Sequence, residues 1–278
     1  MFRTQRMWTV ARTELRQLLQ AKDFWVPMAL LGGIFFVVIP MIILSIINGV
    51  GNQQAVQQVS QALDLLPQSA KDAVPKGIPP EAQVSYTLAV FLLAPVAVVV
   101  PLTISSAVGA STIVGERERG TGEFLAHSPA DTREIYLGKL IASLVPGYLT
   151  TVIGFTAYSI LVNAILAGKV GYLFFPTPSW WLLIVWVLPP FIALALSLVL
   201  RLSARVKSTA AAQQATGLVT LPLILIGYAQ ATGALVGADT LKLSLIIGAV
   251  AWVIAGISLV TGVRSIKRSA LLGVANEQ

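Results

Sequence analysis

Charge is concentrated in one short stretch of a chain that is otherwise strongly apolar. The stretch runs from Gly115 to Leu125, reads GERERGTGEFL, and directly follows the apolar residues 85–114. Thr121 has a side chain that can cap a helix, and Glu123 would then lie in the first turn, where the helix dipole favours a carboxylate. We therefore expect a short amphipathic helix at a membrane surface, where a partner contacts it from the water side. The alternative is a plain solvated loop, because charged runs are most often solvated.

Groups for catalysis and metal binding are scarce. Cysteine is absent and His127 is the only histidine, which excludes disulfides and thiolate metal sites and leaves no pair of imidazoles for zinc. The phosphate loop G-x-x-x-x-G-K-[ST] and the motifs G-x-S-x-G and H-E-x-x-H are also absent. We expect that the chain binds no metal or cofactor and that it is not an enzyme by itself.

All twelve acidic residues lie outside the long apolar stretches of the chain. They are Glu14, Asp23, Asp64, Asp72, Glu81, Glu116, Glu118, Glu123, Asp131, Glu134, Asp239 and Glu277. A proton-driven carrier normally needs ionisable residues at membrane depth, where their high cost marks a functional role. The pattern disfavours a proton- or sodium-driven carrier, although a sodium site made of backbone carbonyls stays open.

The composition is that of an integral membrane protein. Of the 278 residues, 56% are hydrophobic and 11% are charged, and the mean hydropathy is +0.80, whereas about a quarter of the residues in soluble domains are charged. Six apolar stretches are each long enough to cross a hydrocarbon core of about 30 Å. They cover residues 24–47, 85–114, 140–168, 179–200, 208–236 and 241–263. We predict one all-α domain over residues 1–278, in which the long second stretch projects into the cytoplasm and carries the charged stretch.

The basic residues are distributed unevenly between the two sides of the membrane. With the N-terminus inside the cell, 15 basic residues fall in cytoplasmic segments and only Lys71, Lys76, Lys169 and Lys242 fall outside. This asymmetry follows the positive-inside rule and places both termini and the charged stretch in the cytoplasm. The net charge is +7, but the basic residues flank the apolar stretches, so we expect contact with membrane lipid and none with nucleic acid. The first apolar stretch is too long for a cleaved signal peptide and is expected to stay as a span.

Residues 4–22 have the spacing of an amphipathic helix. Apolar residues recur three or four positions apart, at Trp8, Ala11, Leu15, Leu18 and Leu19. Polar residues fall elsewhere, at Arg6, Arg12, Glu14, Arg16 and Gln20. A basic polar face opposite a tryptophan predicts a helix that lies in the membrane interface. The alternative is a helix that packs on a soluble partner.

Two features could take part in transport, and a third marks the outer membrane interface. Residues 48–84 form the longest outer segment and are expected to contain a short helix that Pro67 ends, either as a simple surface helix or as a lid. Pro189 and Pro190 should kink the fourth stretch, either as a hinge or as a tolerated bend. Trp180 and Trp181 begin that stretch, as in an aromatic belt at the outer interface.

The fifth apolar stretch begins with polar residues. Gln213, Gln214 and Thr216 would lie within the membrane, where lipid cannot satisfy their hydrogen bonds. They would either line a path for a substrate or hold two helices together, and the sequence does not decide between the two. Residues 231–240 leave room only for a small re-entrant element before the sixth stretch, unless that element takes residues from the outer end of the fifth stretch around Gly227 and Gly233.

The charged stretch and the residues after it resemble the first cytoplasmic loop of the ABC-2 membrane family. That loop commonly reads E-x-x-x-G-T-x-E-x-L-x-x-[ST]-P, with G-K soon after. The matching residues are Glu116, Gly120, Thr121, Glu123, Leu125, Ser128, Pro129, Gly138 and Lys139. Gly122 departs from the family, which usually has an aliphatic residue there, and a glycine weakens a helix by up to about 1 kcal/mol. The helix is therefore expected to begin either at Thr121 or at Glu123.

This resemblance implies a permease subunit of a type-2 ABC exporter in the cell membrane of a prokaryote. In the family the loop forms a coupling helix that docks on a cytoplasmic ATP-binding subunit, and two such subunits bind ATP and Mg. The residues expected at this contact are Glu116, Arg117, Glu118, Arg119, Gly120, Thr121, Glu123, Phe124 and Leu125. The resemblance further implies a second permease copy, in a homodimer or a heterodimer. The path would be mostly apolar, which suits a hydrophobic or amphipathic substrate.

Two other functions stay open on the sequence. A scaffold or sensor subunit that transports nothing would show the same spans and the same charge asymmetry, but it would not need an ATP-binding partner. A secondary carrier is the least favoured, because the apolar stretches contain no acidic residue.

Overall fold

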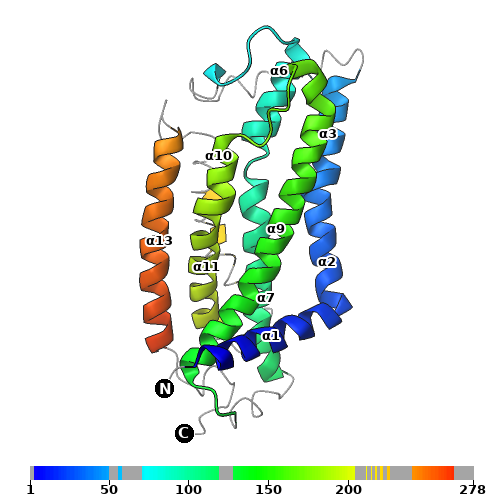
Figure 1. Cartoon of the computed structure of the whole chain (residues 1–278). Helices are drawn as coiled ribbons and strands as arrows, with labels where there is room; N and C mark the ends of the chain where they lie inside the picture. Colours follow the sequence, from blue (N-terminus) through cyan, green and yellow to red (C-terminus); the bar gives the residue numbers. More distant parts are fainter. Residues whose placement is uncertain are drawn as a thin grey trace.

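Five long helices stand side by side, and a sixth, shorter helix lies across one end of them (Figure 1). The structure is a computed structural model that describes residues 3–49, 56–57, 71–118, 128–203 and 240–265, with 211, 214, 217, 220, 221, 224 and 225. All secondary structure in these residues is helical, as the composition predicts. Five helical segments are long and apolar enough to cross a membrane, and they coincide with five of the six predicted stretches. They are Lys22–Asn48, Pro80–Thr112, Thr132–Val170, Pro178–Leu202 and Ser244–Arg264.

The predicted fifth stretch lies mostly outside the described residues. All seven of its described residues, between 211 and 225, are helical. A sixth span over residues 208–236 therefore stays a prediction, as does a re-entrant element in residues 231–240. The helix expected before Pro67 also falls largely outside the described part of the chain.

The predicted interfacial helix is α1, Thr4–Gln20, which crosses the lower end of the bundle in Figure 1. A single extended residue, Ala21, separates α1 from α2, Lys22–Gly33. The first span continues through the π-helical η1, Ile34–Val38, and ends with α3, Ile39–Asn48.

The central helix of the bundle is α9, Thr132–Val170, which runs the full height of the molecule (Figure 1). It packs on α1 at the lower end and on α7, Val96–Glu118, along its side. The last two described spans are formed by α10, η3 and α11 (Pro178–Trp181, Leu182–Val187 and Leu188–Ser203) and by α13 (Thr240–Ser265). Close contact needs small residues: a Cβ on Gly147 of α9 would lie 2.0 Å from Ser105 Oγ of α7.

The second span is interrupted, whereas the sequence predicts a continuous stretch over residues 85–114. It consists of α6, Pro80–Thr87, the π-helical η2, Leu88–Leu92, a turn at Leu93–Pro95, and then α7. Pro95 has no N–H group to donate to the preceding turn, which frees carbonyl groups within the membrane. Side chains from other helices satisfy them: Tyr158 Oη donates to the Ala89 carbonyl at 2.7 Å, and Trp180 Nε1 donates to the Val90 carbonyl at 2.8 Å.

All three π-helical segments end shortly before a proline. η1 precedes Pro40, η2 precedes Pro95, and η3 precedes the predicted kink at Pro189 and Pro190. A proline leaves the carbonyl four residues earlier without its donor, and the wider π-turn redistributes the remaining hydrogen bonds.

Polar side chains fasten the upper ends of three helices. Lys169 Nζ of α9 donates to Asn48 Oδ1 of α3 at 2.7 Å, and Asn48 Nδ2 donates to Ser85 Oγ of α6 at 2.8 Å. Nearby, the predicted aromatic belt is wrong for Trp180, which is buried against Phe155 and Tyr158 because its indole is needed at the break in the second span. Trp181 is 53% exposed, as a belt residue should be.

Candidate functional site

The predicted contact with a partner begins at the lower end of α7. Glu116, Arg117 and Glu118 form the last helical turn of α7. The other predicted contact residues lie outside the described part of the chain: Arg119, Gly120, Thr121, Glu123, Phe124 and Leu125. The structure thus shows the elements on either side of the predicted coupling helix, and the coupling helix itself stays a prediction.

One buried lysine joins three helices just above this end of α7. Lys139 of α9 is fully buried, and its Nζ donates to Glu14 Oε1 of α1 at 2.8 Å. The same ammonium group donates to the backbone carbonyl of Thr112 in α7 at 2.6 Å. A buried charge is tolerated only when it is paired and hydrogen-bonded. Lys139 therefore makes the positions of α1, α7 and α9 depend on one another.

The burial of Glu14 corrects the predicted orientation of α1. The sequence places Glu14 among the polar positions, yet it is only 8% exposed, whereas Trp8 is 57% and Leu19 is 73% exposed. The face that contains Ala11 and Glu14 turns towards α9 because Gly138 of α9 lets the two backbones approach. A Cβ on Gly138 would lie 2.8 Å from Val10 Cβ and 3.0 Å from the Met7 carbonyl.

A second carboxylate fixes the start of α9 to the start of α1. Glu134 Oε2 accepts from the Asp131 backbone N–H at 2.9 Å, while Asp131 Oδ1 accepts from the Thr132 N–H at 2.7 Å, as in a capping box. Glu134 Oε1 also accepts from the backbone N–H of Arg3 at 2.6 Å, at the beginning of α1. The first turn of α9, which directly follows the predicted coupling helix, is thereby held on α1.

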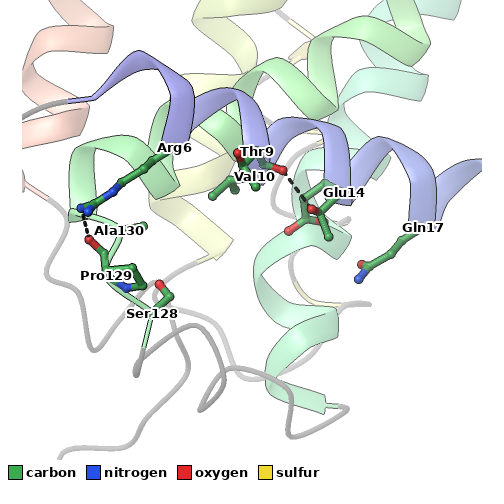
Figure 2. A pocket seen from close by; sticks show the side chains of 9 residues that line it. Arg6, Thr9, Val10, Glu14, Gln17, Ser128, Pro129 and Ala130 are labelled. Carbon is green, nitrogen blue, oxygen red and sulfur yellow. Dashed lines mark hydrogen bonds between the residues drawn. The ribbon is translucent and has the colours of Figure 1, made fainter.

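Arg6 ties the end of the predicted coupling loop to the same helix. Its guanidinium donates to the carbonyl of Pro129, the last residue of the family-like pattern before α9 (Figure 2). Between α1 and residues 128–130 lies a pocket of about 280 Å³. Its lining consists of Arg6, Thr9, Val10, Thr13, Glu14, Gln17, Ser128, Pro129 and Ala130 (Figure 2). The accessible surface of this pocket is mostly apolar, so it offers apolar contact to a protein partner beside the loop.

The predicted path residues of the fifth stretch are only partly described. Gln214 is helical and exposed on the isolated chain, and Gln213 and Thr216 lie outside the described residues. A separate groove of about 330 Å³ lies between the first two spans, with Asp23 and Met28 on one side and Thr103 and Ile104 on the other. Within the part of the chain that the structure describes, no cluster of three His, Cys, Asp or Glu residues could hold a metal.

Sequence reasoning missed the bond between Lys139 and Glu14, although a signal exists. Glu14 is the only acidic residue before Asp23, in a helix that carries Arg6, Arg12 and Arg16 and directly follows Arg3. Lys139 stands among apolar residues at the very start of the third stretch. An isolated acid and an isolated base in such settings suggest a buried pair, because each is costly to bury alone.

The comparison with protein-family models gives a match over most of the chain. A family model described as "ABC-2 family transporter protein" matches residues 8–246, from the second turn of α1 into α13. None of the curated proteins matches the chain.

Proposed function

Because the chain belongs to the ABC-2 transporter family and is thus a membrane-embedded permease subunit of an ABC transporter, we propose that it exports a substrate with energy from ATP hydrolysis on a separate subunit. The proposed complex contains two cytoplasmic ATP-binding subunits and a second permease copy, in the cell membrane of a prokaryote. The substrate would be hydrophobic or amphipathic, because the described spans contain few charged groups. Both termini and the predicted coupling helix would face the cytoplasm.

The observation that carries this proposal is the bond of Lys139 to both α1 and α7. In the proposed cycle, ATP binding closes the two ATP-binding subunits and displaces the coupling helix that follows Glu118. α7 then moves with it, and the Thr112 carbonyl shifts relative to Lys139. Since Lys139 also holds Glu14, the displacement passes to α1 and to the whole length of α9.

The links from Glu134 and Arg6 act at the other end of the coupling loop. Glu134 joins the first turn of α9 to Arg3, and Arg6 holds the Pro129 carbonyl. A displacement of the coupling loop is therefore transmitted to α1 from both ends of the loop, through α7 and through the segment before α9. In this mechanism α1 is the element that links the loop to the membrane spans.

Charge reversal in the coupling loop tests the proposal. Substituting Lys for Glu116, Glu118 and Glu123 together should abolish association with the ATP-binding subunit or reduce ATP turnover of the purified complex to the level of that subunit alone. The measurement is co-purification of the chain with the products of neighbouring reading frames, followed by an ATPase assay.

The matched control reverses the three acidic residues of the outer segment. This variant combines Asp64→Lys, Asp72→Lys and Glu81→Lys. It changes the net charge by the same amount as the coupling-loop variant, but it should leave association and ATP turnover intact. Equal loss in both variants, or no loss in either, would contradict the proposed contact. A six-span protein that co-purifies with no nucleotide-binding partner would favour the scaffold or sensor function instead.

A further inference from the structure

A second polar network lies at the lower ends of α11 and α13, apart from the coupling elements. Arg201 is the penultimate residue of the fourth described span, and its side chain reaches across to α13. Its Nη2 donates to Thr261 Oγ1 at 2.9 Å, to Ser258 Oγ at 3.0 Å and to the Ser258 carbonyl. The guanidinium is thereby held in one orientation by neutral oxygen atoms.

Hydroxyl groups from two further positions complete this cradle. Ser197 Oγ, one turn before Arg201 on α11, accepts from Arg201 Nη2 at 3.2 Å and donates to the Ser258 carbonyl at 3.0 Å. Tyr136 Oη of α9 lies 3.1 Å from Ser197 Oγ. Three helices thus contribute to fixing one cationic side chain at the end of a membrane span.

The Arg201 charge has no carboxylate in its cradle. The sequence contains no Asp or Glu between Glu134 and Asp239, or between Asp239 and Glu277. At this end of the bundle Glu14 is paired with Lys139, and Glu134 accepts from the backbone of Arg3 and Asp131. Within the described residues, Arg201 Nε is buried without a hydrogen-bond partner, and the bonds to the cradle use Nη2.

The surrounding sequence adds more positive charge at the same level. Arg264 is the last residue of the span formed by α13, one turn beyond Thr261, and it is exposed. In the sequence, the segments that follow the two spans contain four basic residues, Arg205, Lys207, Lys267 and Arg268, and one acidic residue, Glu277. Among the described residues, no carboxylate pairs with this guanidinium at the end of the span, and a phosphate group would match it.

We propose that the lower ends of α11 and α13 bind the phosphate of an anionic phospholipid, with Arg201 as the oriented donor and Arg264 as a second cation. The phosphate would accept from Arg201 Nη1, because Nη2 is bonded to the cradle and Nε is buried. The acyl chains would lie along the exposed apolar face of α13, which includes Ile257 and Val260. This binding does not depend on the proposed transport or on an ATP-binding subunit.

The test measures binding of fluorescent phosphatidylglycerol to the purified full-length chain in detergent. Arg201→Met should weaken the apparent affinity by about tenfold or more, as expected for the loss of a hydrogen bond to a charged group. Arg201→Lys keeps the charge but not the planar fork, and it should give an intermediate affinity. Lys242→Met, at the other end of α13, is the matched control and should bind like the wild type.

Competition with other ligands identifies what binds at this site, and the variants identify the role of Arg201. Phosphatidylcholine should compete weakly and inorganic phosphate should not displace the lipid at equal concentration; displacement by phosphate would overturn the lipid assignment. Unchanged phosphatidylglycerol binding in Arg201→Met would show that Arg201 only holds α11 to α13. If that variant does not fold, Arg264→Met, which leaves the cradle intact, should show the weaker binding, and wild-type affinity there would contradict the proposal.

Discussion

At the residue scale, Lys139 links stability to the proposed coupling. Its ammonium group is fully buried and has both a carboxylate and a backbone carbonyl as acceptors. Breaking a buried ion pair by removing one partner strands the other charge and costs about 3–5 kcal/mol, whereas replacing both partners by apolar residues is often nearly neutral. Stability and coupling can therefore be separated by mutation.

Lys139→Met should lower the free energy of unfolding by about 3 kcal/mol, because Glu14 is left buried without its cation. Adding Glu14→Met to the same chain should recover most of this loss. Denaturation of the purified chain in detergent gives both values. The recovered double variant should still fail to couple ATP turnover to the permease, since the bond to the Thr112 carbonyl is gone; normal coupling in it would assign Lys139 a structural role only.

Single residues divide sharply into those the sequence could reveal and those it could not. The family pattern includes Lys139, but the helical spacing alone places its partner Glu14 with the solvated residues of α1. The reason is that a helical period identifies faces and does not say which face meets which neighbour. Gly138 determines which face of α1 contacts α9, because the absence of a side chain there lets Val10 of α1 pack against the α9 backbone.

At the scale of elements, the break in the second span depends on side chains from two other helices. The Ala89 and Val90 carbonyls face a low-dielectric interior, and their donors are the Tyr158 hydroxyl and the Trp180 indole. An unsatisfied buried carbonyl costs about 1–3 kcal/mol. The broken helix is thus held in shape by α9 and α10.

Tyr158→Phe should lower the free energy of unfolding by about 1–3 kcal/mol, since it removes the donor and keeps the ring. Trp180→Phe should cost more, because it removes the donor and also leaves a cavity in place of part of the buried indole. Trp181→Phe is the matched control: Trp181 is exposed, and its substitution should change stability by no more than about 0.5 kcal/mol. Thermal unfolding of the three variants in one detergent compares them. Wild-type stability in both buried variants would show that the carbonyls need no such donors.

The membrane spans can be predicted from the sequence, but the break in the second span cannot. Apolar length alone locates Lys22–Asn48 and Thr132–Val170, because only a helix can satisfy its backbone within lipid. The interruption at Leu93–Pro95 is not predictable in this way. Pro101 and Pro146 also lie in predicted spans, yet α7 and α9 continue through them as α-helices. What separates Pro95 is the pair of distant donors, which a local pattern cannot show.

At the scale of the whole molecule, the proposed function depends on which side of the membrane holds α1. The last turn of α7 and the start of α9, between which the predicted coupling helix lies in the sequence, are at the same end of the bundle as α1 (Figure 1). The distribution of basic residues predicts that this end lies in the cytoplasm, where an ATP-binding subunit could reach it. The proposed function requires this orientation.

Because the chain contains no cysteine, single-cysteine variants can report the orientation without background labelling. Leu173→Cys, at the upper end and 78% exposed, should react with a membrane-impermeant maleimide in intact cells. Thr13→Cys, which lines the lower pocket, should react only after the cells are permeabilised. The reverse pattern would put the coupling loop outside the cell, where there is no ATP-binding subunit to contact it, and ATP-driven export through this loop would be impossible whatever the outcome of the other experiments.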